Sequence, residues 1–109
     1  MAARTALLVS SLLLAAPCFA ETHVVDQVNK TFVMNGAPIA TLEIKKGDSI
    51  SFKNGDNFFH NIFSLSDLTI FDLGSYPFGE ARSVQFDEVG TVEVECAIHP
   101  DMHMIVEVK

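Results

Sequence analysis

The residues with the clearest chemistry lie together near the C-terminus, in the segment Cys96-Ala97-Ile98-His99-Pro100-Asp101-Met102-His103-Met104. Cys96 follows a run in which apolar and polar residues alternate, so it is expected to end a strand, with His99 and Met102 at successive steps of three. The three side chains can therefore converge from one short loop. A thiolate, an imidazole and a weak thioether are donors of blue-copper sites, which also need a second imidazole.

A second imidazole is available at His60, in the segment Phe58-Phe59-His60-Asn61-Ile62-Phe63. Turn-forming residues precede this segment, so His60 is expected near the start of a strand, where its ring can point toward the Cys96 loop. The phenylalanines beside it would exclude water, and a dry shell tunes the reduction potential of a metal site. His60 therefore completes the candidate donor set.

Taken singly, each of these residues also has a structural explanation, because cysteine and methionine are frequent core residues and a histidine can sit half-buried in a strand. The joint pattern favours a metal site. Zinc usually takes four strong ligands with paired Cys or His spacing, whereas one Cys, two His and a thioether suit copper better. The sequence thus predicts a copper site.

Residues 1–20 have the pattern of a secretory signal peptide, because Arg4 precedes an apolar run and Cys18-Phe19-Ala20 resembles a cleavage site. The apolar run is too short to span a bilayer. Cleavage after Ala20 would leave one domain, residues 21–109, with Cys96 as its single cysteine and no internal disulfide. A single cysteine in such a domain can be a buried core residue, half of an intermolecular disulfide, a nucleophile or a metal ligand, so the cysteine count alone leaves these four roles open for Cys96.

The composition of residues 21–109 limits the classes of partner. Six basic residues stand against fourteen acidic ones, for a formal charge of −8. This balance argues against a nucleic-acid partner and suits steering toward a cationic protein. No stretch approaches the roughly 20 apolar residues of a membrane helix, so no membrane span is expected.

Short runs of period two, separated by Gly, Asn and Asp clusters, indicate an all-β domain. The expected strands are Thr22–Val28, Lys30–Met34, Ala37–Ile44, Ser49–Lys53, His60–Phe63, Arg82–Phe86, Thr91–Cys96 and Met104–Val108, with a further short one around Leu68–Phe71 in the long connection after Ser64. Val92, Val94 and Cys96 should share one face. Strands of this length and spacing favour an antiparallel sandwich or barrel of about seven strands.

The loop Cys-x-x-His-Pro-x-Met resembles the short ligand loop of the amicyanin and plastocyanin branch of the small cupredoxins. The segment Lys45–Phe52, followed by His60-Asn61, resembles the part of that family that carries the first ligand. The resemblance covers about residues 39–109. It implies a Greek-key β-sandwich or barrel of seven to eight strands with one type 1 copper per chain. The implied ligands are His60, Cys96 and His99 around the copper and Met102 as the axial ligand, with the Asn61 amide bonded to the thiolate.

Two departures from the family pattern leave alternatives. Ala97-Ile98 stand where many members carry Thr-Pro, so a side-chain bond from Asn61 to that Thr is absent. A longer loop variant of the family places its methionine five residues after the histidine, which makes Met104 the alternative axial ligand. Pro100 favours Met102, because the short loop is the one that carries proline there.

The resemblance implies a periplasmic carrier of single electrons, cycling between Cu(II) and Cu(I), and not an enzyme. The edge of His99, with Ile98 and Pro100, is the expected electron port and docking patch. Such carriers exchange electrons with partners such as a c-type cytochrome or a periplasmic amine dehydrogenase, and a monomer is expected.

The alternative function is a periplasmic copper chaperone or storage protein. It would use the extra donors His103, Met104 and His23. Cleavage after Ala20 would also expose Glu21-Thr22-His23, and a free amine with His in third position can bind Cu(II) in a square plane.

Overall fold

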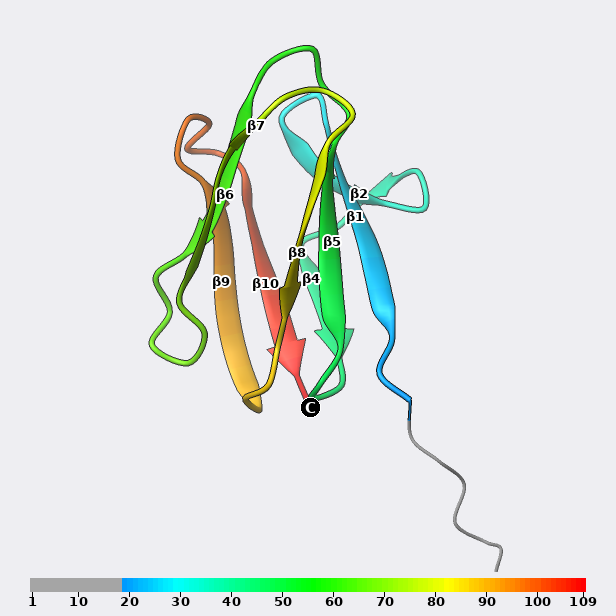
Figure 1. The fold of residues 1–109 in the computed structure, drawn as a ribbon, viewed down its shortest axis with the longest axis vertical. Helices are drawn as coiled ribbons and strands as arrows, with labels where there is room; N and C mark the ends of the chain where they lie inside the picture. The colour runs from blue at the N-terminus through cyan, green and yellow to red at the C-terminus, as the bar shows by residue number, and fades with distance from the viewer. Residues whose placement is uncertain (1–18) are drawn as a thin grey trace, which may run out of the picture.

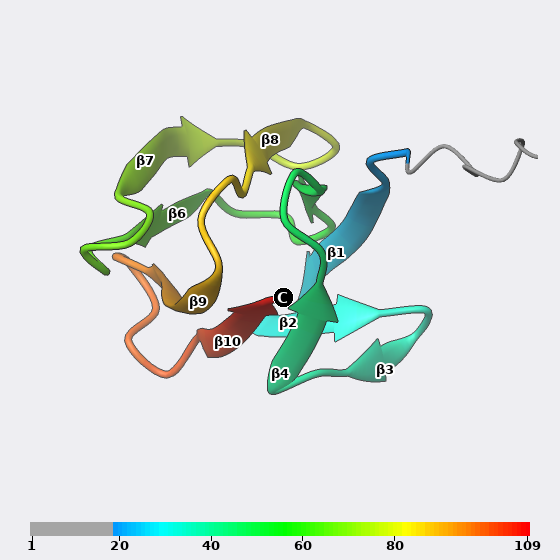
Figure 2. The ribbon, with the colours of Figure 1, turned by 90° about the horizontal axis from the view of Figure 1, so that it is seen from below.

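The computed structural model describes residues 19–109, which form the all-β fold that the sequence predicts (Figure 1). Ten strands lie in this range: β1 (Thr22–Val28), β2 (Thr31–Met34), β3 (Ala37–Pro38), β4 (Thr41–Ile44), β5 (Ser49–Asn54), β6 (His60–Ser64), β7 (Phe71–Tyr76), β8 (Ala81–Gln85), β9 (Gly90–Cys96) and β10 (His103–Val108). They form two five-stranded sheets, in the orders β3-β2-β1-β5-β8 and β4-β10-β9-β6-β7. The two sheets pack face to face, and their edge strands β7 and β8 lie side by side (Figure 2).

Strand pairing is mostly antiparallel, as expected, but each sheet also contains one parallel pair. β1 runs parallel to β5, with Thr22 opposite Ser49, and β10 runs parallel to β4, with Val108 opposite Ile44. Both pairs join segments that are distant in sequence, and the β4–β10 pair joins the first half of the domain to its last strand.

The strand count exceeds the predicted seven to eight, partly because the single strand expected over residues 37–44 is divided. β3 pairs with β2 in one sheet, whereas β4 pairs with β10 in the other. Between them, the Ile39 amide donates to Phe32 O at 3.0 Å and the Ile105 amide donates to Ala40 O at 2.9 Å, so the chain crosses between sheets there. Pro38 suits the end of an edge strand, because it has no amide to donate.

The short strand expected around residues 68–71 is also misplaced, because β7 occupies Phe71–Tyr76 instead. Gly74, which looks like turn punctuation in the sequence, has a φ of 70° inside β7, and its amide is held by Asp72 Oδ1 at 2.8 Å. The ladder between β6 and β7 shifts register near this point. A bulge, which one sequence cannot distinguish from a turn, explains the error.

The core lies between the sheets and confirms the predicted alternation along β9. Val92, Val94 and Cys96 are all buried, while Thr91 and Glu93 face outward. The same period of two that fills the core with valines therefore brings the sulfur of Cys96 to the inner edge of the sheet.

A buried polar network joins the two sheets near the upper end of Figure 1. The Tyr76 hydroxyl, on β7, donates to Gln27 Oε1 on β1 at 2.8 Å. Burial raises the pKa of Tyr76, and the nearby Cys96 raises it further, so the hydroxyl keeps its proton. Asn54 Nδ2 donates to the carbonyls of Phe58 at 2.8 Å and Tyr76 at 2.9 Å. These bonds fix the loop that leads into β6.

At the opposite end, the buried carboxylate of Asp48 fastens the start of β1. It accepts hydrogen bonds from the amide of Glu21 at 2.9 Å and the amide of Lys45 at 3.0 Å, and its Oδ2 lies 3.0 Å from His23 Nε2. The Glu21 amide, then the His23 ring and the Lys45 amide, lower the pKa of Asp48 from 3.8 to about 2. The amide of Glu21 and the ring of His23 are therefore both engaged in this arrangement.

The predicted signal peptide falls almost entirely on residues 1–18, which lie outside the described residues, so it stays a prediction. In the part of the chain that the structure describes, no helix has the length and apolar character needed to cross a membrane.

Asp48 makes the stability of the domain depend on acid. Because its pKa is lower in the folded chain than the ordinary 3.8, its contribution is complete above about pH 4 and is lost as the pH falls toward 2. Urea unfolding followed between pH 5 and pH 2 should show the free energy of unfolding falling over this range. Asp48→Asn should flatten that fall, whereas Asp67→Asn, which removes the same charge at an exposed position, should not. Equal slopes for Asp48→Asn and the parent chain would contradict the assignment.

Candidate metal centre

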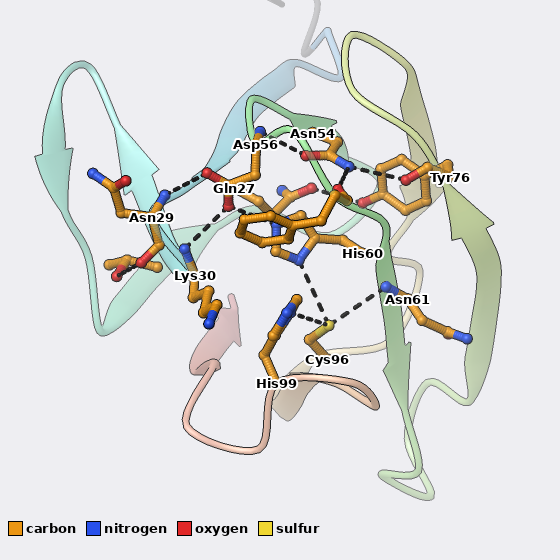
Figure 3. A network of polar contacts seen from close by, with 12 residues as sticks. Gln27, Asn29, Lys30, Asn54, Asp56, His60, Asn61, Tyr76, Cys96 and His99 are labelled. Atoms are coloured by element: carbon orange, nitrogen blue, oxygen red, sulfur yellow. Dashed lines mark hydrogen bonds and ion pairs between the residues drawn. The ribbon is translucent and has the colours of Figure 1, made fainter.

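Three of the predicted ligands converge at the upper end of the sandwich. Cys96 Sγ lies 3.7 Å from His60 Nδ1 and 3.5 Å from His99 Nδ1, and one ligand atom from each residue lies within 4.8 Å of the others. Figure 3 shows both rings turned toward the sulfur. No other group of three His, Cys, Asp or Glu residues in the described range, 19–109, meets in this way.

Two adjacent strands and one loop bring these donors together. His60 is the first residue of β6 and is fully buried, and Cys96 is the last residue of β9 and is 2% exposed. β6 and β9 are antiparallel neighbours with Ile62 opposite Cys96, so the ladder itself sets the distance between the imidazole and the sulfur. His99 comes from the loop between β9 and β10 and is only partly buried.

Main-chain hydrogen bonds close this loop. The Ala97 amide donates to Asn61 O at 3.0 Å, the Met102 amide donates to His99 O at 2.9 Å, and the Cys96 amide donates to Met102 O at 3.3 Å. These bonds hold the loop in place around Ala97-Ile98. Met102, at the end of this loop, is 1% exposed, so its thioether lies in the interior.

The sulfur of Cys96 also receives a hydrogen bond from the main chain. The Asn61 amide lies 3.4 Å from Sγ, while the Asn61 side chain is turned away to Ser75 Oγ at 3.4 Å. This N–H points its positive end at the sulfur that would bind the metal. Asn61 thus contacts the site through its amide.

A residue that the sequence analysis did not identify as functional holds the far side of the His60 ring. Asp56 Oδ2 lies 2.8 Å from His60 Nε2, and the pair is buried. The Asp56 carboxylate also accepts the amides of Asn29 at 2.6 Å and Lys30 at 3.0 Å. Asp56 was interpreted only as part of a turn, although a carboxylate four residues before a candidate ligand was a signal that could have identified it.

The charge state of Asp56 follows from these contacts. Burial raises its pKa, but the Lys30 amide, the His60 ring and the Asn29 amide outweigh that effect, so the pKa lies below its ordinary value. An ionised carboxylate accepts the Nε2–H of His60. This fixes the tautomer in which Nδ1, the atom facing Cys96, has a free lone pair for a metal.

Phe58 shields the two histidines from the side. Its ring centre lies 5.5 Å from that of His60 and 5.2 Å from that of His99, in edge-to-face geometry. Burial lowers the pKa of His99, and the charges of His60 and Lys30 lower it further against the opposite effect of Asp56. A neutral His99 presents its Nδ1 lone pair as a ligand at neutral pH.

The remaining candidate donors are Met104, His103 and His23. Met104 is fully buried in β10, opposite Val94 in the ladder. His103 is 44% exposed, and its Nε2 lies 3.1 Å from Glu93 Oε1 on the outer face of the same sheet. His23 is at the opposite end of the domain with Asp48. Neither of these two histidines belongs to the cluster around Cys96.

The spacing of the donors matches a bound first-row metal ion. With ordinary bond lengths to sulfur and nitrogen, an ion shared by a thiolate and an imidazole separates them by about 3.6 to 3.8 Å. The two sulfur–nitrogen distances of 3.5 and 3.7 Å fall close to this range. One thiolate, two imidazoles and a buried thioether form the soft, low-coordinate donor set that favours copper.

A sequence-family model agrees with this donor set. Residues 24–109 match the model described as copper binding proteins, plastocyanin/azurin family. The chain belongs to this family. Its metal is therefore copper, and the predicted small cupredoxin class is confirmed. No curated protein sequence gives a significant match.

Solved structures of cupredoxins share the fold. A variant of amicyanin in its Cu(I) form superposes with a TM-score of 0.70 at 24% identity, over 81% of this chain and 82% of that one. An oxidised amicyanin variant gives a TM-score of 0.69 at 25% identity, with the same coverage. A copper-containing nitrite reductase from Thermus scotoductus SA-01 has a TM-score of 0.70 at 23% identity, over 91% of this chain but 25% of the reductase.

The contact between Asp56 and His60 predicts an effect on copper affinity. Asp56→Asn removes the charge that fixes the His60 ring, and loss of such a partner typically weakens metal binding by about 10- to 100-fold. Chelator competition on the Cu(I) form measures the affinity directly. Asp67→Asn is the matched control, since it removes the same charge at an exposed position. Equal affinities for the two variants would show that Asp56 does not support the ligand.

Proposed function

We propose that this chain is a periplasmic type 1 copper protein that carries single electrons between redox proteins. The observation that carries the proposal is the convergence of His60 Nδ1, Cys96 Sγ and His99 Nδ1 in a family whose members bind copper. In this proposal these three residues are the equatorial ligands. Copper bound there would cycle between Cu(II) and Cu(I), taking up or releasing one electron.

The polypeptide would contribute rigidity to this reaction. Sheet pairing places His60 beside Cys96, and loop hydrogen bonds hold His99, so the ligands need little movement when the copper charge changes. A rigid donor set lowers the reorganisation that accompanies electron transfer. The Asn61 amide, 3.4 Å from Cys96 Sγ, belongs to the same fixed surroundings. In this proposal the chain carries electrons and is not an enzyme.

His99 is the proposed electron port. It is the one equatorial ligand of the proposed set that reaches the surface, and Ile98, which is 50% exposed, lies beside it. With Pro100 it offers a small apolar patch, a surface suited to brief contact with another protein. The acidic surface would add long-range attraction to a cationic partner.

A copper chaperone or storage protein is less well supported. Such a protein would use additional soft donors near the site, but Met104 packs in the core and His103 pairs with Glu93. His23 and the Glu21 amide are engaged with Asp48. The electron carrier is therefore the function that the geometry supports best.

Location and partners follow from the sequence pattern and the family. We propose that residues 1–20 are an export signal, that residues 21–109 are the mature cupredoxin domain, and that the domain works as a monomer in the periplasm. Its similarity to amicyanin makes a c-type cytochrome or an amine dehydrogenase the proposed class of partner.

The thiolate ligand can be tested spectroscopically. The chain from Glu21, loaded with Cu(II), should show an intense thiolate-to-copper band and narrow copper hyperfine splitting in electron paramagnetic resonance. Cys96→Ser should lose both, because the hydroxyl cannot replace the copper–thiolate bond. A weak square-planar spectrum that survives Cys96→Ser and disappears in His23→Ala would overturn the proposal and favour copper handling at the N-terminus.

The axial ligand can be tested by comparing two buried methionines. Met102→Leu should keep the blue band but raise the reduction potential, because it removes a donor that stabilises the more highly charged Cu(II). Met104→Leu replaces a core side chain with one of similar volume, which typically costs under about 1.5 kcal/mol of stability, and should leave the potential unchanged. The reverse pattern, measured by cyclic voltammetry, would assign Met104 as the axial ligand.

A further inference from the structure

A hollow of about 460 Å³ lies directly beside His99. It is formed between the turn that joins β1 to β2 and the loop that joins β9 to β10, and its lining residues are Asn29, Lys30, Ile98, His99, Pro100 and Asp101. In Figure 3 the side chain of Lys30 extends toward the same end of the site as His99. The hollow therefore places a primary ammonium group next to the proposed electron port.

The backbone of this turn is held in an unusual conformation. Asn29 and Lys30 have φ values of 54° and 57°, in the left-handed region that non-glycine residues seldom adopt. Both amides donate to the buried carboxylate of Asp56, which also binds His60. Such conformations persist where the surroundings over-determine them, often at functional sites. The position of Lys30 is thus fixed by the same carboxylate that fixes a ligand.

The Lys30 side chain contacts an aromatic ring. Its Nζ lies 5.6 Å from the centre of the Phe58 ring, within the range of a cation–π contact. Phe58 in turn packs edge-to-face on His99. The Lys30 ammonium is therefore held on the side of the hollow that leads to the exposed edge of His99.

Lys30 keeps its positive charge available. Among residues 19–109 it takes part in none of the ion pairs, whereas Arg82 pairs with Glu80 and Lys109 pairs with Glu43. Two carboxylates face this region. Asp56 is buried and satisfied by amides and His60, and exposed Asp101 lines the far wall of the hollow. A local cation beside the port contrasts with the overall acidic surface.

We propose that the hollow between Lys30 and His99 receives a carboxylate that the redox partner presents beside its own redox centre. This inference rests on the proposed electron-transfer function. The acidic surface attracts a cationic partner from a distance, and Lys30 then pairs with one anionic group at the contact. The ion pair sets the orientation of the partner over His99, so that the two redox centres approach through the shortest route.

The test uses two small reductants of opposite charge on the Cu(II) protein. Iron(II)–EDTA is a dianion with a carboxylate surface, hexaammineruthenium(II) is a dication, and each gives one electron to Cu(II). Lys30→Gln should slow reduction by iron(II)–EDTA about threefold at roughly 0.1 M ionic strength, because it removes a positive charge from the hollow that His99 also lines. Reduction by hexaammineruthenium(II) should be unchanged or faster.

Lys46→Gln is the matched control. Lys46 is exposed in the turn between β4 and β5, at the opposite end of the domain from His99 (Figure 1), and the substitution removes the same charge. β9, which runs between the two ends, has seven residues and so spans about 20 Å, against a Debye length of about 10 Å. The Lys46→Gln variant should therefore be reduced by iron(II)–EDTA as fast as the parent chain. The Asp56 contact uses the main-chain amide of residue 30, so Lys30→Gln should keep the blue band, which reports that the ligands are intact.

A second readout locates the anion without electron transfer. Hexacyanochromate(III), a redox-inert paramagnetic trianion, should broaden the amide resonances of residues 29, 30, 98 and 99 in the Cu(I) protein, and Lys30→Gln should abolish that broadening. The inference would be overturned if iron(II)–EDTA reduced the Lys30→Gln and Lys46→Gln variants at equal rates, or if hexacyanochromate(III) broadened the resonances of other residues instead. It would also be overturned if the chain formed a dimer that depends on Lys30. A chain with no blue band, or one that neither complex reduces, would instead overturn the proposed function.

Discussion

The pairing of β6 with β9 is the contact on which the rest of this structure depends. It places Ile62 opposite Cys96, so that His60, two residues before Ile62 and on the same face of the sheet, meets Cys96 at the end of the sandwich. Neither strand could slip by one residue without moving its donor to the outer face. The valines that fill the core from β9 enforce this register. The chemistry of the site is thus a consequence of core packing.

The buried carboxylate of Asp56 extends this constraint to the loops. From the loop before β6, it joins the turn after β1 to the ring of His60 through three partners, the amides of Asn29 and Lys30 and Nε2 of His60. A buried charge is costly unless its hydrogen-bonding capacity is filled, so each of these partners stabilises the position of the others. The ligand His60 and the left-handed turn that carries Lys30 are consequently held in place by the same carboxylate. Asn54, Tyr76 and Gln27 form a neutral network beside it that ties the same loop to the other sheet.

Local patterns were sufficient to predict much of the fold and the candidate cluster. Alternation along β9 indicates which face Cys96 occupies, and the spacing of Cys96, His99 and Met102 indicates a single loop. The division of residues 37–44 between two sheets was missed, because it depends on which distant strand each half pairs with. Asp56 lies only four residues before His60, but most of its contacts are distant in sequence, and it was missed largely for the same reason. Its partners at Asn29 and Lys30 are 27 and 26 residues away, and only the folded chain brings them together.

The uneven burial of the donor set has a consequence for the kinetics of metal exchange. His60, Cys96 and Met102 are at most 2% exposed, and only His99 borders solvent. An incoming or departing ion must therefore pass where His99 stands, and the loop must open for it. Opening breaks the bonds that close the loop, from Ala97 to Asn61 and from Cys96 to Met102. The residence time of the ion is then set by how often this loop opens, while the affinity for the ion is set by the ligands that the sandwich holds in place.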